Sequence, residues 1–241
     1  MLDRNKPTPL YVQLEEEIRT SIQDGNWEIG HAIPSENELG KCYGISRMTV
    51  RQVLTKLVNE GILYRVQGKG TFIAEPKIKT SSLAYRGIRE QLEELGYETG
   101  TKLLRFEKQQ PSSDIQLSLE LSEEDSVYYI ERLRYANGKP LSIHRSYLPC
   151  KVCPELSDQL METEQLCVIL KDTYGLVPKR FLETLESVIA HPDEKELLEL
   201  PPKFTILKLE DLIYSEDGIP YEFSKVLFRG DRIKLHFEYE N

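Results

Sequence analysis

The segment from Pro34 to Ile73 restricts the fold of this chain more than any other part of its sequence. Ser35-Glu36-Asn37-Glu38 has the form of a capping box, which begins a short helix, and Gly44 follows as a helix terminator. Ser46 is in position to cap a second helix, which Gly61 ends. Residues 62–66 and 71–74 have the β-branched and aromatic composition of strands, joined by a glycine-rich turn. Two short helices, a tight turn and a β-hairpin predict a winged helix-turn-helix.

A further helix is expected ahead of this segment. Thr8 is predicted to cap it, with Pro9 at the first helical position, where a missing N–H costs nothing. One apolar face follows at helical spacing, formed by Tyr11, Leu14, Ile18 and Ile22. Gly25 is expected to end the helix.

The start of the third helix is basic, and this favours duplex DNA as the partner. A helix that enters the major groove with its N-terminus presents its first residues to bases and phosphates. Arginine donates two hydrogen bonds to guanine, and a lysine between two glycines at a hairpin tip suits close approach to a phosphate. The residues expected to contact DNA are Ser35, Glu36, Ser46, Arg47, Thr49, Arg51, Gln67, Lys69 and Thr71. The alternative is a winged helix that binds protein.

The same segment resembles the DNA-binding domain of GntR-type bacterial transcription regulators. The blocks PSE-x-EL, SRMTVRQ-x-L, L-x-x-EG-x-L-x-R and G-x-GTF match at the usual spacing over about residues 8–74. Asn37 departs from the pattern, because the family often has arginine there. The resemblance implies specific binding to operator DNA.

Charge is unevenly distributed along the chain. The net charge is −9 and the pI about 5.2. Residues 44–77 carry six Lys or Arg against two Asp or Glu, whereas residues 78–241 carry 21 against 30. We expect a basic patch on an acidic body, which directs DNA to one face. The sequence shows no long apolar run and no signal peptide, so we expect a cytoplasmic protein with no membrane partner.

The cysteines do not have the pattern of a disulfide framework. Cys150 and Cys153 have the C-x-x-C spacing of a redox or metal pair, but no histidine lies at ligand spacing. Incidental thiols are the favoured interpretation. We expect no metal and no cofactor.

Residues 75–82 are polar, contain a proline and are predicted to form a linker between a domain at 1–74 and another at 83–241. Mostly antiparallel strands with a few helices predict an α+β fold for the second domain. The predicted strands are Lys102–Gln109, Val127–Ala136, Leu141–Leu148, Pro178–Ala190, Phe204–Tyr214, Ile219–Phe228 and Arg232–Glu240. The predicted helices are Leu83–Leu95, Ser113–Leu119, Gln165–Tyr174 and Asp193–Leu198.

Two hairpin signals repeat within this domain. Asn137-Gly138-Lys139-Pro140 and Asp217-Gly218-Ile219-Pro220 each join two strand-like segments, and Asn-Gly and Asp-Gly strongly favour tight hairpins. We expect two related hairpins with a ligand cleft between them.

The order of these elements resembles the UTRA effector-binding domain of the HutC branch of the GntR family, which has a chorismate-lyase-like fold. The motifs are E-R-x-R-Y-A-N-G-x-P, S-Y-L-P at 146–149 and D-G-x-P-x-E-x-S-x-x-x-F-R-G-D-R at 217–232. The resemblance covers about residues 78–241. It implies a domain that binds a small metabolite, often a sugar phosphate or amino-sugar phosphate, and thereby changes affinity for DNA.

Arg132 and Arg134 alternate on one predicted strand and therefore point to the same face. Two adjacent guanidiniums repel unless an anionic ligand, or an internal carboxylate such as Glu131 or Glu222, lies between them. A solvated strand face is the alternative. The resemblance implies that these arginines contact the effector. His144 stands where the resembled proteins often carry glutamate, and a structural histidine is the alternative there. The expected effector residues are Arg86, Arg132, Arg134, His144, Ser146, Glu222 and Ser224.

Together these features predict a homodimeric DNA-binding regulator, a repressor, that reads a near-palindromic operator and responds to a metabolite. An enzyme is the second class, because the resembled fold includes a lyase, but no nucleophile elbow, H-E-x-x-H or P-loop is present in the C-terminal part. A redox-sensing regulator that uses Cys150 and Cys153 is the third.

Overall fold

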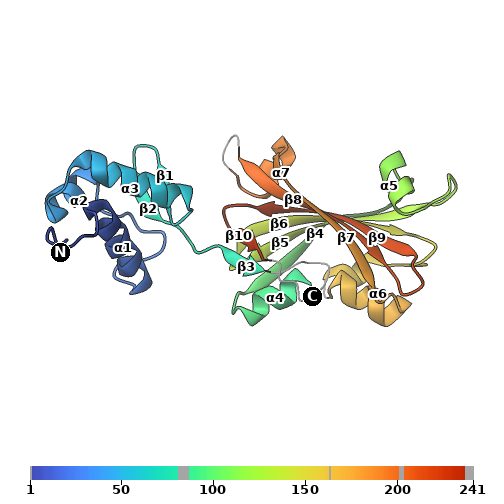
Figure 1. The fold of residues 1–241 in the computed structure, drawn as a ribbon. Helices are drawn as coiled ribbons and strands as arrows, with labels where there is room; N and C mark the ends of the chain where they lie inside the picture. Colours follow the sequence, from blue (N-terminus) through green and yellow to red (C-terminus); the bar gives the residue numbers. More distant parts are fainter. Residues whose placement is uncertain (1, 81–86, 163, 201–203, 237–241) are drawn as a thin grey trace. The chain divides into compact units, whose positions relative to one another are not determined.

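A computed structural model describes residues 2–80, 87–162, 164–200 and 204–236 of the chain. It divides into two compact units, residues 1–77 and 78–241 (Figure 1). The division falls within the segment predicted as a linker. Each unit has its own apolar core and is described by itself.

The first unit is a winged helix-turn-helix. Its elements are α1 (Leu10–Gln23), α2 (Glu36–Tyr43), α3 (Arg47–Asn59), β1 (Leu63–Val66) and β2 (Gly70–Ile73). The predicted capping box forms, with Ser35 accepting from the Glu38 amide and Glu38 accepting from the Ser35 amide. Gly44 has φ +64°, a left-handed conformation that glycine adopts without strain, and it ends α2. Ser46 caps α3 as predicted.

The start of α1 differs from the prediction. Pro9 occupies the N-cap position and no side chain caps the helix, so the prediction that Thr8 caps it was wrong. The Gln13 amide instead donates to the Thr8 carbonyl oxygen at 2.7 Å. The side chain of Gln13, in the first turn of the helix, therefore fixes the backbone that precedes the helix.

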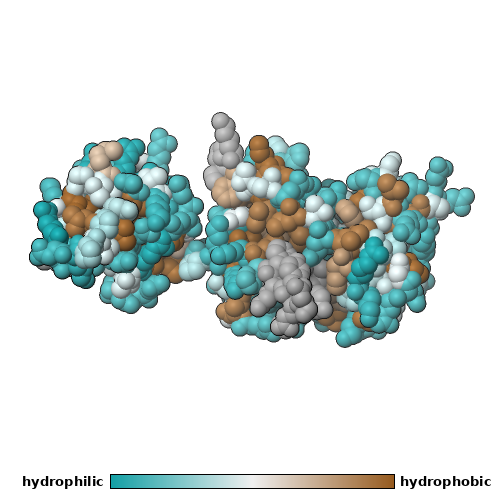
Figure 2. Space-filling model, viewed as in Figure 1, coloured by the Kyte–Doolittle hydropathy of each residue, from teal (hydrophilic) through white to brown (hydrophobic). Residues whose placement is uncertain are grey.

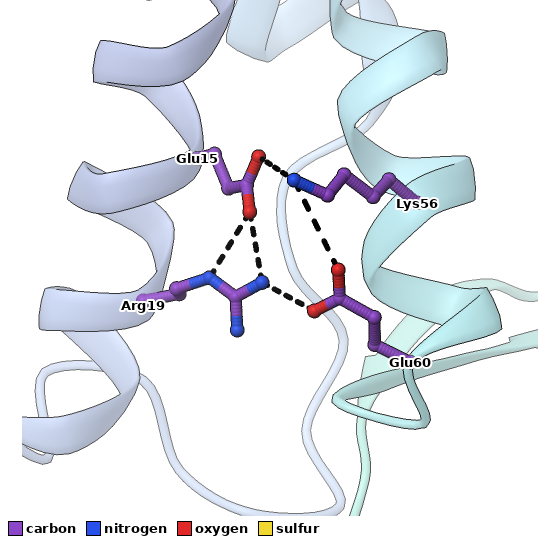
Figure 3. Close-up of polar contacts among 4 residues, drawn as sticks. All are labelled: Glu15, Arg19, Lys56 and Glu60. Carbon is purple, nitrogen blue, oxygen red and sulfur yellow. Dashed lines mark hydrogen bonds and ion pairs between the residues drawn. The ribbon is translucent and has the colours of Figure 1, made fainter.

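Four charged side chains link α1 to α3 (Figure 3). Glu15 accepts from Lys56 at 2.8 Å and from Arg19 at 2.8 Å, and Glu60 pairs with both of these cations. These bonds hold the pKa of Glu15 below its usual value. The network joins the first helix to α3 beside the buried contacts of Leu14, Ile18 and Leu57.

The second unit is built on a six-stranded sheet whose neighbouring strands are all antiparallel, in the order β4-β5-β6-β9-β8-β7. The strands are β4 (Thr99–Gln109), β5 (Val127–Ala136), β6 (Lys139–Pro149), β7 (Arg180–Ile189), β8 (Thr205–Tyr214) and β9 (Pro220–Arg229). The two predicted hairpins are β5–β6 and β8–β9, and they meet along β6 and β9. The predicted α+β fold is confirmed.

Helices cover both faces of this sheet (Figure 1). They are α4 (Ile88–Glu94), α5 (Ser113–Ser118), α6 (Leu166–Tyr174), α7 (Pro192–Leu197) and the 3₁₀ helix η1 (Asp158–Glu162). On the face with α7, Arg145 donates to Glu131 and to Glu194. Lys225 approaches Asp114 of α5 on that same face. Residues that alternate with Glu131 and Arg145 therefore point to the other face, toward α4 and α6.

Two expectations about the segments beside the sheet are borne out only in part. Ile78–Thr80 forms a strand, β3, which pairs in parallel with β10 (Ile233–Leu235). The segment predicted as a linker thus contributes buried Ile78 and Thr80 to the second unit. The predicted strand Arg232–Glu240 is reduced to β10 within the described part of the chain.

Strand β7 is an edge of the sheet with apolar side chains on its surface. Leu182, Leu185 and Ile189 are 49%, 41% and 70% exposed. Figure 2 shows brown, apolar residues on the face of this unit that is turned to the viewer, where β7 crosses the front in Figure 1. No helix in the described part of the chain is both long and apolar enough to cross a membrane.

Candidate functional sites

The first unit contains a hollow of about 840 Å³ where the start of α2, the start of α3 and the β1–β2 turn come together. Seven of the nine residues predicted to contact DNA line it: Ser35, Glu36, Arg47, Arg51, Gln67, Lys69 and Thr71. Asn37 and Arg65 line it as well. Segments separated in the sequence therefore form one surface that carries several basic side chains.

Glu36 organises the arginines of this surface. Its carboxylate accepts from Arg47 Nε at 3.0 Å and lies 3.9 Å from Arg65, which also donates to Thr55. Glu36 thus acts as an internal partner that orients two guanidiniums. Arg51 and Lys69 are exposed.

Ser46 and Thr49 do not line the hollow. The Ser46 hydroxyl lies 2.8 Å from that of Thr49 and accepts from the Thr49 amide, so both side chains take part in capping α3. Their predicted contact with DNA stays a prediction, and the structure assigns them a role at the start of the helix.

The second unit contains a cavity of about 470 Å³ between α4, α6 and the sheet strands β5, β6, β8 and β9. The predicted effector residues that line it are Arg132, Arg134, His144, Ser146, Glu222 and Ser224. Arg86 lies outside the described residues. The cavity covers the junction of the two hairpins, where the sequence predicted a cleft.

The two arginines are buried, at 4% and 7% exposed. Burial lowers the pKa of Arg132, and burial together with the neighbouring charge of Arg132 lowers the pKa of Arg134 to about 9. Arg134 donates to Thr101 at 2.9 Å, and within the described residues it forms no ion pair with a carboxylate. The Nε atoms of both guanidiniums are buried without a hydrogen-bond partner among those residues. The site therefore holds positive charge with unused donors.

Arg132 is compensated in part by Glu222. It donates to Ser146 Oγ at 3.3 Å, and Ser146 in turn bonds to the Glu222 carboxylate. Burial raises the pKa of Glu222 and the charge of Arg132 opposes that rise. Of the two internal partners considered for the arginines, Glu222 fits. The hypothesis that Glu131 lies between the two arginines was wrong, because Glu131 lies on the other face of the sheet and binds Arg145.

His144 lies directly opposite Arg132 across β5 and β6. Its Nε2 is 3.0 Å from Ser142 Oγ, and its ring packs edge-on against Phe228. Burial, then the charges of Arg134 and Arg132, lower its pKa well below the ordinary value. A neutral imidazole at this position offers hydrogen bonds without adding charge to the cavity.

Sequence reasoning missed several polar residues of this cavity, among them Asp211 on β8 and Gln165 beside α6. Asp211 is 2% exposed, accepts from Ser224 at 3.3 Å through Oδ2, and has a buried Oδ1 without a hydrogen-bond partner among the described residues. Burial, then the charges of Glu183 and Glu222, raises its pKa to about 8. The available signal was an acidic residue in the inward position of a strand, since Leu209 and Asp211 alternate on one face.

The C-x-x-C pair does not have the features of a reactive thiol site. Cys153 is fully buried in an apolar cluster, and burial raises its pKa to about 12, which disfavours the thiolate. Burial also raises the pKa of Cys150. Among the described residues, no group of three or more His, Cys, Asp or Glu side chains is placed to hold a metal ion.

Comparisons with known proteins agree with this architecture. Residues 10–73 match the family of bacterial regulatory proteins called gntR, and residues 94–234 match the UTRA domain. The HTH-type transcriptional repressor NagR of Bacillus subtilis is 31% identical over 96% of this chain and 95% of its own length. The histidine utilization repressor of Pseudomonas putida is 28% identical over 80% of this chain and 77% of its own.

A solved structure supports the fold. The crystal structure of PhnF from Mycobacterium smegmatis superposes with a TM-score of 0.63 at 23% identity, covering 94% of this chain and 98% of that one. At this identity the likeness concerns the fold alone.

Proposed function

Because this chain belongs to the gntR family of bacterial regulatory proteins and carries a UTRA domain, we propose that it represses transcription from a specific operator under the control of a small anionic metabolite. It is a regulator and not an enzyme. Two of its relatives are named as repressors, which supports repression as the direction of control.

Arg134 carries the proposal about the effector. A buried cation with no anionic partner is costly, since the desolvation of a charge is recovered only when a counter-charge meets it. In the described residues Thr101 offers Arg134 a neutral oxygen and no carboxylate pairs with it. An anion in the cavity would supply the missing charge and accept from the unused Nε donors.

A phosphorylated sugar fits this cavity best among common anionic metabolites. Two neighbouring guanidiniums suit the several oxygens of a phosphate. His144, Ser146 and Ser224 supply neutral donors and acceptors for hydroxyl groups along the cavity wall. The volume of about 470 Å³ suits a ligand of that size.

We propose a homodimer as the DNA-binding form. A two-fold dimer of winged units reads two half-sites about one helical turn, roughly 10 bp, apart, which makes the operator near-palindromic. The exposed apolar side chains of β7 support self-association, because a long apolar sheet edge is rarely left uncovered. Sedimentation of the full chain tests this, and a monomer at micromolar concentration that still binds operator would contradict it.

Strand β3 offers a route by which the cavity is coupled to the first unit. The chain leaves the first unit at Lys77 and enters β3 at once. Thr80 at the end of β3 donates to Gln91 of α4, and Ile88 at the start of that helix lines the cavity. A ligand that shifts α4 would therefore also shift the residues that precede the helix. This movement would change the relative populations of the DNA-binding and non-binding states.

The test combines two measurements on the full chain. Operator DNA is selected from a random duplex pool, and sugar phosphates and related acids are then screened by thermal shift and for their effect on operator affinity. Arg132→Ala is expected to lose the thermal shift while keeping operator affinity, because the arginine lies in the second unit. A compound that binds through Arg132 yet leaves operator affinity unchanged would refute metabolite control.

A further inference from the structure

The cavity of the second unit has two chemically different ends. One end carries Arg132 and Arg134 from β5, and the other carries Asp211 from β8. The sheet order places β6 and β9 between these strands, so the two ends lie on opposite sides of the hairpin junction.

A row of serines connects the ends. Ser146 lies directly opposite Ser224 across β6 and β9, and Ser224 lies directly opposite Asp211 across β9 and β8. The Arg132 guanidinium reaches Ser146, and Ser224 donates to Asp211, each at 3.3 Å. Two strand spacings separate Ser146 from Asp211, which is about 10 Å between their backbones. A small molecule can therefore touch both ends at once.

The Asp211 end is acidic. Glu183 is its direct cross-strand neighbour on β7, and Glu222 lies on β9. Both charges, together with a side-chain hydrogen bond to Glu183, disfavour ionisation of Asp211. Arg132 is already engaged with Ser146 and Glu222. Asp211 Oδ1 is buried and lacks a hydrogen-bond partner among the described residues, although its partner oxygen Oδ2 is satisfied. A donor that also carries positive charge would bond to this oxygen and favour the ionised form of Asp211, whereas a hydroxyl would only supply the hydrogen bond.

We propose that Asp211 and Ser224 form a second subsite of the effector cavity, which binds a protonated amine of the effector while the arginines bind its anionic group. The effector is then a zwitterion with its two charges at opposite ends. This inference rests on the proposed anion site, because the amine is placed relative to it.

The experiment uses the full chain and probes that do not depend on knowledge of the effector. Inorganic phosphate tests the arginine end alone. Linear ω-aminoalkyl phosphates of two to five carbons, each compared with the alkyl phosphate of equal length, test the Asp211 end. Affinities are measured by titration calorimetry for wild type, Asp211→Asn, Ser224→Ala and the control Asp172→Asn. Asp172 also lines the cavity but is exposed, so its replacement removes an acid without altering the buried subsite.

We expect the amine to raise the affinity of the best-fitting probe about ten-fold or more over its alkyl partner, as for a hydrogen bond between charged groups. Asp211→Asn should abolish this gain, Ser224→Ala should reduce it, and Asp172→Asn should keep it, with phosphate affinity unchanged throughout. If phosphate binds through Arg134 but the amine gives no gain at any length, or if the gain survives Asp211→Asn, the subsite is refuted and the anion site stands. If neither phosphate nor any probe binds, both the proposed anion site and the amine subsite are refuted.

Discussion

Replacement of Arg134 by methionine should stabilise the second unit while abolishing its response to anions. Burial and the neighbouring charge of Arg132 lower the pKa of this guanidinium from 12.5 to about 9, so the charged form is disfavoured by about 5 kcal/mol at most. Relaxation of the site and penetration of water reduce that figure, and loss of the bond to Thr101 costs about 1 kcal/mol. Methionine retains most of the aliphatic volume. We therefore expect a net gain of about 2 kcal/mol in the free energy of unfolding at pH 7.

The pH dependence follows from the same shift. Between pH 9 and the unfolded value of 12.5, the unfolded chain holds the proton that folded Arg134 has released, so this residue makes the wild type more stable as pH rises. The penalty is fully present below pH 9. The advantage of Arg134→Met should thus be constant at neutral pH and shrink above pH 9.

Urea unfolding of the full chain measures both effects. Far-UV circular dichroism follows the sheet, and Trp27, the single tryptophan, reports on the core of the first unit and serves as an internal control. Phosphate at 100 times its dissociation constant should add about 2.7 kcal/mol to the wild type and nothing to the variant. Arg105→Met, which replaces an exposed arginine of β4, is the matched control. A variant less stable than wild type in the absence of anions, or one that phosphate still stabilises, would refute the reasoning.

Three further outcomes are expected. Arg51→Ala should weaken operator binding by about 1–3 kcal/mol with little change in binding to random DNA, whereas Lys69→Ala should weaken binding to both and reduce the salt slope by about 1. Fluorescence anisotropy over a range of salt concentrations measures both effects. Equal losses of affinity for both DNAs in Arg51→Ala would contradict a role of Arg51 in reading bases. Glu15→Gln should lower the stability of the first unit by about 1 kcal/mol at pH 7, and the difference should vanish as pH falls through the depressed pKa of Glu15, with Trp27 fluorescence as the readout. Serine at both Cys150 and Cys153 should leave DNA binding under oxidant unchanged, because burial keeps these thiols protonated; a lost oxidant response would restore the redox hypothesis.

Local chemistry explains which parts of the fold were predictable. The capping box at Ser35 and the Asn137-Gly138 turn depend on neighbouring residues only, so the sequence was sufficient for both. The predicted strand at 232–240 includes β10, but β3 and its parallel pairing with β10 were missed, because β3 has only three residues and its partner comes from the opposite end of the second unit. Thr8 was predicted as a cap on residue preference alone, and Pro9 took that position in the structure.

The candidate cavity was predictable on one side only. Arg132 and Arg134 alternate within a motif, and two like charges on one face of a strand require an explanation in any fold. Asp211 follows Leu207 and Leu209 on the inward face of β8, which marks it as unusual but does not say what it faces. Only the order β5-β6-β9-β8 brings it to the same cavity as the arginines. That order is a property of the whole sheet and is not encoded near any one of these residues.

The two units differ in whether the charges expected to recognise a partner are exposed or buried. Residues 78–241 carry 21 Lys or Arg against 30 Asp or Glu, yet the cavity within this acidic unit presents two buried guanidiniums. Charges on the surface are screened over about 8 Å at physiological salt, whereas buried charges at short range are screened much less. The charge of the ligand that the cavity accepts is therefore set by the side chains that line it and not by the net charge of the unit. We therefore expect the contribution of the exposed Arg51 and Lys69 to DNA binding to depend on salt, and the binding of an anion between Arg132 and Arg134 to depend on it much less.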